Sequence, residues 1–329
     1  MRDRLLGALL VVPFVIGATM PFSQASGEQV FRFQDPAIVE SSALVVQDGL
    51  FITTNDSGDR GRVFAVDPAT GRTVGVTEWA EEPTDVEALA PGGHGTVWVG
   101  DLGDNTHGRD SVCIARVPVG RGDRTVHPPC YPLTYPDGAR DAETLLRNPA
   151  TGRLYVVDKN VFRGTLYAVP RRLSAHHANR LRAVGSVLSL ATDGSFFPDG
   201  RHLVLRDYVG AIVYRFPSLQ AVARLALPAQ QQGEGIAVAA DGRVYVSSEG
   251  QDQPVLRAPL PPAVRREVAA PSPSPTSTEP PSTRALPGNL QASDPSVQQP
   301  YHRDAGQWLL GGLLAVVALV VGLLALRPR

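Results

Sequence analysis

The chain has 329 residues, a net charge of −1 and 43% hydrophobic residues, and its length corresponds to about two domains. No cluster of basic residues alternates with aromatic side chains, so we expect no nucleic-acid partner. Lys159 is the single lysine of the sequence, and the other basic residues apart from histidine are arginines.

Residues 1–25 have the pattern of a signal peptide for export. Two arginines precede the apolar run Leu5–Ile16, and Ser23 and Ala25 are small residues before a cleavage site after Ala25. A buried N-terminal helix is the alternative interpretation. Export would place the body of the protein on the extracellular side of the membrane.

A repeat of about 45 residues runs through the middle of the chain. Glu40–Leu44 corresponds to Asp85–Leu89, and Asn55–Asp59 corresponds to Gly100–Asp104, in both cases at an offset of 45. Further copies begin at Asp141, Thr192 and Gly233. This period is typical of a four-stranded propeller blade, so the sequence predicts an all-β fold.

The stretch Asp85–Asn105 shows how one copy is built. Two short apolar runs are joined by the turn Pro91–Gly95 and carry carboxylates at their outer ends, a pattern that predicts a β-hairpin with its acids side by side. Each copy continues with a third strand, and four copies have a fourth.

We predict a β-propeller of five blades over residues 29–260, with six blades as the alternative. The fifth copy ends at Ala258 without a fourth strand, whereas Gln29–Gln34, reading QVFRFQ, stands alone before the first copy. An N-terminal strand that completes the last blade would close the ring and remove its open edges.

The motifs DVEAL, GDLGDN, DAETL, FFPDGR and EGIA over about Glu40–Leu260 resemble those of exported actinobacterial phytase-like and esterase-like β-propellers. The resemblance implies the propeller fold, and it includes calcium-dependent phosphatases among its members. The chain lacks the dense set of lysine and arginine side chains with which the phytases bind phosphate.

Strand direction alternates in a propeller blade, so the starts of first strands and the ends of second strands share one face. The acids expected to hold a cation there are Glu87, Glu143, Glu234, Asp85, Asp141, Asp101 and Asp104. The further residues expected to form a binding face are Asp56, Asp59, Asp158, Lys159, Asp207 and Glu249.

Several carboxylates in a small space must bind cations, keep protons or pair with bases. Oxygen ligands in loops suit Ca²⁺, which takes about 6–8 oxygens, so Ca²⁺ is the expected cofactor. In the alternative interpretation the acids form a structural ring, in which they cap turns or pair with Lys159, Arg109 or Arg206.

The two cysteines, Cys113 and Cys130, are expected to form a disulfide, because an isolated pair in an exported chain is usually bonded. They lie in segments that read as neighbouring antiparallel strands, Ser111–Val117 and Pro129–Tyr135. A reactive thiol is the alternative.

The C-terminal part reads as a linker and an anchor. Residues 261–305 are rich in proline, serine and threonine and are expected to be disordered. Residues 308–326 are apolar and uncharged and have the length of about 20 residues needed to cross a membrane. Arginines in the tail, residues 327–329, place that end in the cytoplasm, giving a single-pass type I protein of the cell membrane.

Two functions follow as hypotheses. The first is a binding module whose acidic face recognises an extracellular protein or a ligand of the cell envelope, with or without Ca²⁺. The second is a calcium-dependent hydrolase of the phosphatase, esterase or lactonase kind. The sequence contains neither a G-x-S-x-G nor an H-E-x-x-H motif, and this favours the binding module.

Overall fold

The computed structural model describes residues 25–56 and 58–269, which form five β-sheets and one helix. Within these residues no helix combines the length and the apolar character needed to cross a membrane. The expected signal peptide, except for Ala25, and the expected membrane span at 308–326 lie outside the described residues.

The first two sheets have four strands in chain order and one short outer strand. The first contains β2 (Ser41–Gln47), β3 (Leu50–Asn55), β4 (Arg62–Asp67), β5 (Arg72–Trp79) and β9 (Arg124–Val126). The second contains β6 (Val86–Gly93), β7 (Thr96–Asp101), β8 (Val112–Pro118), β10 (Tyr131–Thr134) and β14 (Asn179–Arg180).

The other three sheets have four strands each. The third contains β11 (Ala142–Arg147), β12 (Leu154–Asp158), β13 (Gly164–Ala168) and β15 (Arg182–Val187). The fourth contains β16 (Asp193–Phe196), β17 (His202–Arg206), β18 (Gly210–Arg215) and β19 (Gln220–Ala226). The fifth contains β20 (Gly233–Val238), β21 (Val244–Ser248), β22 (Pro254–Ala258) and β1 (Glu28–Arg32).

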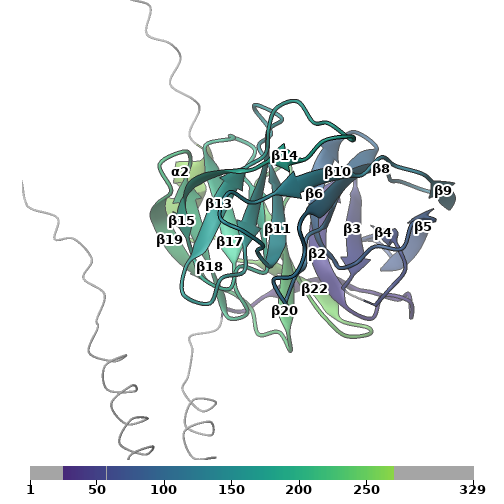
Figure 1. Cartoon of the computed structure of the whole chain (residues 1–329). Helices are drawn as coiled ribbons and strands as arrows, with labels where there is room; N and C mark the ends of the chain where they lie inside the picture. The colour runs from purple at the N-terminus through teal and green to yellow at the C-terminus, as the bar shows by residue number, and fades with distance from the viewer. Residues whose placement is uncertain (1–24, 57, 270–329) are drawn as a thin grey trace, which may run out of the picture. The chain divides into compact units, whose positions relative to one another are not determined.

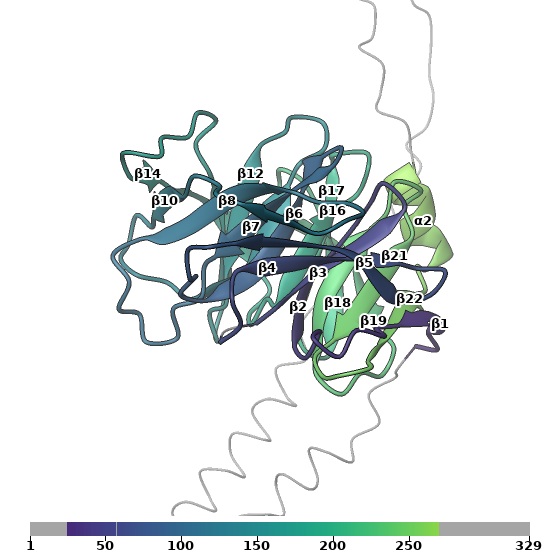
Figure 2. The ribbon, with the colours of Figure 1, turned by 90° about the vertical axis from the view of Figure 1, so that its right-hand side faces the viewer.

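The sheets form a closed ring of five blades (Figures 1 and 2). The first strands β2, β6, β11, β16 and β20 are each in contact with the next, and β20 is in contact with β2. Each of the five hydrophobic clusters joins side chains of two adjacent sheets. The five-bladed propeller is therefore confirmed, and its core lies between the blades.

The N-terminal strand closes the ring, as expected. β1 pairs antiparallel with β22, with Glu28 opposite Arg257 and Arg32 opposite Pro254. Phe31 on this strand is 6% exposed and packs edge-on against Phe33 and Phe51. Because Phe51 belongs to the first sheet, β1 joins the last blade to the first through backbone pairing and side-chain packing.

Three local features differ from the expectation. β6 extends to Gly93, although the turn was expected to begin at Pro91. A bulge and a positive φ of 100° at Gly93 let the strand continue before the chain reverses direction. The outer strands β9 and β14, which were not expected, add parallel to β5 and β10. They have three and two residues, too few for an alternating pattern to show.

The expected start of the disordered linker is wrong. Helix α2 (Pro262–Ala269) follows the last strand directly. Val264 and Val268, four positions apart on one helix face, are buried against the cluster between the fourth and fifth sheets. Pro262 is suited to the first turn of a helix because that position needs no N–H partner. Residues 270–305 of the expected linker lie outside the described residues.

The disulfide is confirmed. Cys113 on β8 and Cys130, which immediately precedes β10, are bonded with their Cα atoms 5.8 Å apart. β8 and β10 are antiparallel, and Pro132 lies opposite Cys113. The bond therefore fastens the outer part of the second sheet.

We predict that Phe31→Ala lowers the free energy of unfolding by about 3–5 kcal/mol, because it leaves a cavity where β1 joins the first blade. Gln29→Ala, on the same strand at an exposed position, is the matched control and should change stability little. Urea unfolding of the two variants and the parent gives the measurement. Equal stability of Phe31→Ala and the parent would contradict the role of β1 in closure.

We also predict that replacing Cys113 and Cys130 together by serine costs about 3 kcal/mol, the chain-entropy value for a closed loop of about 15 residues. The two cysteines are 17 positions apart. The same comparison under reducing conditions provides the control, since the parent should then approach the variant. A parent that keeps its stability when reduced would argue against this contribution.

Candidate functional site

One end of the sheets repeats the same backbone contact in several blades. The residue after the second strand donates its N–H to the carbonyl at the start of the first strand, from Asp56 to Glu40 at 3.0 Å and from Lys159 to Asp141 at 2.9 Å. Glu249 donates in the same way to Gln232 at 2.9 Å. This contact brings the side chains that follow second strands next to those that begin first strands.

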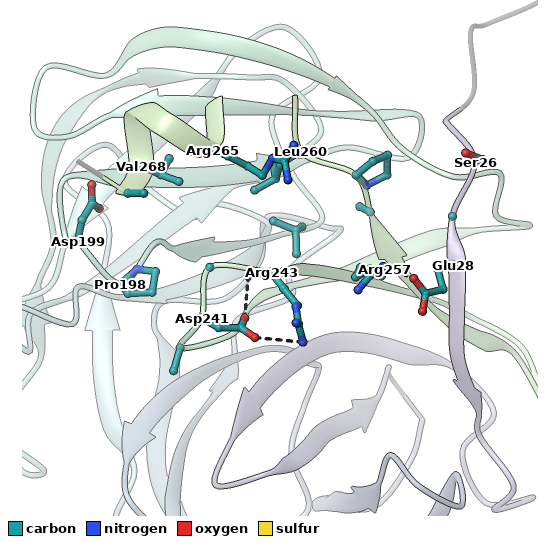
Figure 3. A pocket seen from close by; sticks show the side chains of 17 residues that line it. Ser26, Glu28, Pro198, Asp199, Asp241, Arg243, Arg257, Leu260, Arg265 and Val268 are labelled. Atoms are coloured by element: carbon teal, nitrogen blue, oxygen red, sulfur yellow. Dashed lines mark hydrogen bonds and ion pairs between the residues drawn. The ribbon is translucent and has the colours of Figure 1, made fainter. Parts of the chain in front are cut away.

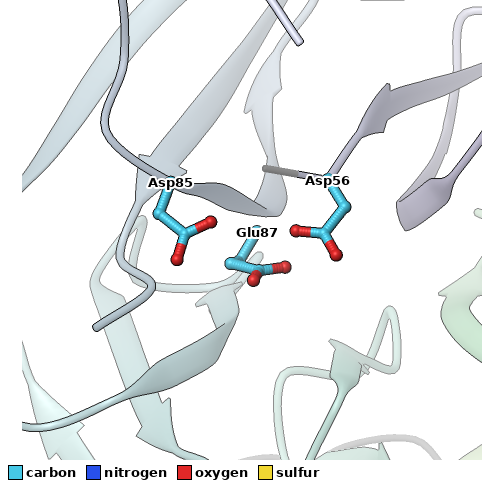
Figure 4. A group of neighbouring side chains, drawn as sticks. All are labelled: Asp56, Asp85 and Glu87. Atoms are coloured by element: carbon cyan, nitrogen blue, oxygen red, sulfur yellow. The ribbon is translucent and has the colours of Figure 1, made fainter. Parts of the chain in front are cut away.

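Three carboxylates meet at this end of the ring (Figure 4). Asp56, Asp85 and Glu87 each offer an oxygen, and these oxygens all lie within 4.8 Å of one another. Glu87 is only 4% exposed, and its Oε2 accepts a hydrogen bond of 3.0 Å from Ser42 Oγ. The Oδ1 atom of Asp85 is buried and has no hydrogen-bond partner in the protein.

The loop after β7 fits closely around Asp85. Gly103 donates its N–H to the Asp85 carbonyl at 3.2 Å. A Cβ atom at position 103 would lie 2.2 Å from Asp85 Oδ2, so any other residue here would displace the carboxylate. Glycine at this position therefore allows the carboxylate to lie beside the loop backbone.

Burial and like charges disfavour ionisation of these acids. Burial, together with the charges of Asp56 and Asp141, raises the pKa of Asp85 from 3.8 to about 6 against the opposing charge of Arg109. Burial also raises the pKa of Glu87 far above its ordinary range, with the charges of Glu143 and Asp56 adding to the effect. The group therefore holds protons or takes up a positive charge.

Glu143 lies beside this group and is joined to the single lysine. It is 5% exposed, and its Oε1 accepts a charged hydrogen bond from Lys159 Nζ, while its Oε2 has no partner in the protein. Burial alone would lower the pKa of Lys159, but the Glu143 carboxylate raises it above its usual range. Lys159 therefore acts as a fixed positive charge and is a poor nucleophile at neutral pH.

Glu234 and Glu249 form a second pair of acids at the same end of the ring. Burial raises the pKa of Glu234, and the charges of Glu143 and Glu249 raise it further. Burial raises the pKa of Glu249 as well, although a hydrogen bond with Glu234 opposes the shift. One proton is thus readily shared between the two groups. We call Asp56, Asp85, Glu87, Glu143, Glu234 and Glu249 the carboxylate centre.

Other acids of the expected cation site bond to the protein. Asp101 pairs with Arg109 at 2.7 Å and accepts a hydrogen bond from the Asp85 N–H. Asp104 accepts hydrogen bonds from the backbone N–H groups of Gly108 and Arg109. Asp141 Oδ1 accepts the Asp104 N–H at 2.9 Å. These three acids order the loops around the centre.

Three residues of the expected binding face also have structural partners. Asp59 pairs with Arg62 at 2.7 Å. Asp158 is 2% exposed and accepts the N–H of Thr165 at 2.6 Å. Asp207 caps its own turn by accepting the N–H of Val209. The alternative of a structural ring therefore describes these residues, whereas two atoms of the carboxylate centre, Asp85 Oδ1 and Glu143 Oε2, are buried without a hydrogen-bond partner.

Asp193, which lies at the repeat position of Glu143 and Glu234, has a role that the sequence did not reveal. It is fully buried, and its Oδ2 accepts N–H groups of Leu44 and Ile236 from two other blades at 3.2 and 2.8 Å. It thus joins first strands across the ring.

Two further polar residues complete the centre of the ring. Arg206 is 1% exposed and donates to Gly235 O at 3.1 Å and to Gln230 Oε1 at 2.9 Å. Burial lowers its pKa to about 10. Ser42, the partner of Glu87, precedes it by 45 positions, so the repeat offset itself could have identified Ser42.

A cavity of about 1140 Å³ lies at the other end of the strands and contains none of the expected site residues. Its lining includes the ion pairs Asp241–Arg243, at 3.3 Å, and Glu28–Arg257 (Figure 3). Arg265 of α2 also lines it. The lining contains three acids and three arginines, so the cavity offers no preference for a ligand of either charge.

Comparison with known proteins concerns the fold. The strictosidine synthase-like, N-terminal family matches residues 217–250, a small part of the chain. No curated protein matches the sequence.

Among solved structures, a glucose dehydrogenase is 11% identical with a TM-score of 0.45, and the match covers 72% of this chain and 100% of that one. A hydrazine synthase of Kuenenia stuttgartiensis is 13% identical with a TM-score of 0.39, covering 69% and 59%. A chain of a nidogen/laminin complex is 15% identical with a TM-score of 0.40, covering 66% and 74%. These proteins are distant in sequence, and the strand pairings described above establish the fold of this chain.

We predict that, in a metal chelator, the protein becomes more stable as the pH falls from about 8 to about 5. The folded state binds more protons than the unfolded chain from the ordinary carboxyl pKa values up to the raised values of about 6 at Asp85, about 7 at Glu143 and about 9 at Glu234. Stability conferred by these acids is thus lost as the pH rises through that window. Thermal unfolding at several pH values gives the measurement.

Asp85→Asn should flatten this pH dependence, whereas Asp241→Asn, an exposed acid paired with Arg243, should leave it unchanged. The measurements should stop at about pH 5, above the range in which Asp104 titrates. Hydrogen bonds from the N–H groups of Arg109 and Gly108 outweigh burial and lower the pKa of Asp104, so its protonation at lower pH would destabilise the protein. Stability that instead falls steadily from pH 8 to 5 would contradict the raised pKa values.

Proposed function

We propose that the carboxylate centre binds a divalent cation of the Ca²⁺ class and that the propeller is a cation-dependent binding module. The observation that carries the proposal is the group of Asp56, Asp85 and Glu87, whose oxygens lie within 4.8 Å of one another while Asp85 Oδ1 is buried without a partner. A cation placed between these oxygens would compensate their charge.

The spacing of the oxygens suits one ion. Ca²⁺ binds oxygens at about 2.3–2.6 Å, so two oxygens up to 4.8 Å apart can both reach the same ion. Glu143 supports the group, since its charge acts strongly on Glu87 and its Oε2 has no protein partner. Oxygens from carboxylates and loops are hard ligands, which favours Ca²⁺ over softer metals.

The remaining coordination positions are where a ligand would bind. Ca²⁺ takes about 6–8 oxygens, more than Asp56, Asp85, Glu87 and Glu143 supply. A ligand with carboxylate, phosphate or carbonyl oxygens would complete the shell. With export through residues 1–25 and an anchor at 308–326, that ligand would be an extracellular protein or a component of the cell envelope.

A calcium-dependent hydrolase is the second candidate function. The observation that favours it is the Glu234–Glu249 pair, in which burial and like charge raise the pKa of both acids. A carboxylic acid that is protonated near neutral pH is able to act as a general acid. An esterase, lactonase and phosphatase screen, with calcium and with chelator, separates this candidate from a binding module.

We predict that saturating calcium raises the stability of the propeller by about 2.7 kcal/mol at a concentration a hundredfold above Kd. The increase should be largely lost in Glu87→Gln, because the variant removes one of the three clustered carboxylates. Asp241→Asn removes an acid at the other end of the strands and should keep the full increase. Thermal unfolding in chelator and in millimolar calcium gives the measurement.

Elemental analysis of the purified propeller should find calcium at one ion per chain before chelation. Equal unfolding temperatures in chelator and in calcium would contradict the proposal and leave a structural ring of acids as the explanation. Hydrolysis that depends on calcium and disappears in Glu234→Gln would replace the binding module by the hydrolase.

A further inference from the structure

Exposed apolar side chains gather in two loops at the same end of the sheets as the carboxylate centre. Val161 and Phe162 lie between β12 and β13 and are 66% and 94% exposed, while Tyr208 and Val209 lie between β17 and β18 and are 37% and 68% exposed. We call these four residues the apolar ridge. Within the described residues only one other large hydrophobic side chain, Val39, is comparably exposed.

The two loops of the ridge are ordered by side-chain caps. Asn160 Oδ1 accepts the N–H of Phe162 at 2.9 Å, and Asp207 Oδ1 accepts the N–H of Val209 at 2.9 Å. Such turns hold the loop backbone in place. The apolar side chains are therefore presented to solvent by fixed loops.

Lys159 connects the ridge to the carboxylate centre. Its ammonium group pairs with Glu143 and lies 5.3 Å from the centre of the Tyr208 ring, a cation–π distance. The loops of two neighbouring blades meet through this contact. The Glu143 side of the carboxylate centre therefore adjoins Tyr208 of the ridge.

We propose that the ridge binds the hydrocarbon part of a free acyl amphiphile, whose carboxylate oxygens are held by the cation at the carboxylate centre. The inference rests on the proposed cation site and adds the class of its ligand. An exposed apolar patch beside a polar site is a common mark of ligand binding.

The charges of this face argue for a small free ligand. Asp56, Asp85 and Glu249 lie at the centre, and Glu40 and Asp207 lie in the surrounding loops. This acidic rim repels an anionic bilayer, and it repels the equally acidic face of a second copy of the chain. A single acyl group meets the cation without bringing other negative charges close to the rim.

The test is calorimetric titration of the calcium-loaded propeller with acetate, butanoate and hexanoate. We expect Kd to fall about two- to fourfold for each methylene that reaches the ridge. Phe162→Ser and Val209→Ser should each weaken hexanoate binding about tenfold, the factor expected for losing one to two buried methylenes and their packing. Acetate, which is too short to reach the ridge, should bind the variants and the parent equally.

Val39→Ser is the matched control, because Val39 is 37% exposed and its N–H bonds to Asn55, the residue before Asp56. It should leave both acetate and hexanoate binding unchanged. Calcium should raise the unfolding temperature of all these variants equally, since none of them alters a carboxylate of the cation site.

Three results would overturn the proposal. One is a ligand affinity that does not depend on acyl chain length, or that Phe162→Ser leaves unchanged, in a protein that calcium still stabilises. The cation site would then be supported, and the role of the ridge would be refuted. Another is co-sedimentation with phosphatidylcholine vesicles, with or without phosphatidylserine, that is lost in Phe162→Ser, because a bilayer would then be the partner. The third is calcium-dependent dimerisation through the ridge. If calcium does not shift the unfolding temperature of the parent, the cation site itself fails.

Discussion

Closure of the ring by β1 is the constraint on which the rest of the structure depends. β1 pairs with β22 near the end of the propeller, so the first and last strands of the described residues are held in one sheet. Once the ring is closed, the five first strands are forced around a common centre. Residues at one repeat position, which are far apart in the sequence, then become neighbours.

The centre of such a ring has little room for hydrophobic packing, and the chain places polar residues there. Ser42, Glu87, Glu143, Asp193 and Glu234 occupy the corresponding positions of the five first strands. Each polar group in this position must find a hydrogen bond or a counter-charge, because burial without one is costly. Differences among these five positions therefore distinguish structural residues from candidate functional ones.

Two of the acids at this position illustrate the distinction. Asp193 accepts three backbone N–H groups, from Leu44, Gly194 and Ile236, and it serves to connect the blades. Glu87 accepts a hydrogen bond from the Ser42 hydroxyl and otherwise faces other acids. A carboxylate satisfied by backbone N–H groups needs no other partner, whereas one opposed by other carboxylates must keep a proton or meet a positive charge.

The sequence predicted the fold well because the evidence for it is local. An offset of 45 residues between repeated motifs, the isolated strand Gln29–Gln34 and the pair of cysteines required no knowledge of side-chain partners. Helix α2 was missed because its two buried valines lie in a segment where proline suggested a linker. Two residues are too few to define a helical period.

The site was predicted less completely, because side-chain partners depend on loop geometry. Asp85 and Asp101 are both acids at the ends of strands in one hairpin, yet Asp101 pairs with Arg109 and Asp85 keeps an unpaired oxygen. The pairing of Lys159 with Glu143 could be expected, because the repeat places both residues on the same face of the propeller. The contact of Lys159 with Tyr208 could not, because it depends on how two blades are rotated against each other.

The charge balance at the centre explains why a lysine is placed beside Glu143. Lys159 compensates one carboxylate, and the shared proton of Glu234 and Glu249 compensates part of another pair. Asp56, Asp85 and Glu87 offer oxygens within 4.8 Å of one another, and at Asp85 the charge of Arg109 opposes burial and the neighbouring acids without cancelling their effect. Their combined charge would exceed that of one divalent ion only slightly, and an acyl ligand would add to the excess. Lys159, held close to that ligand by Glu143 and Tyr208, is the positive charge that would offset it.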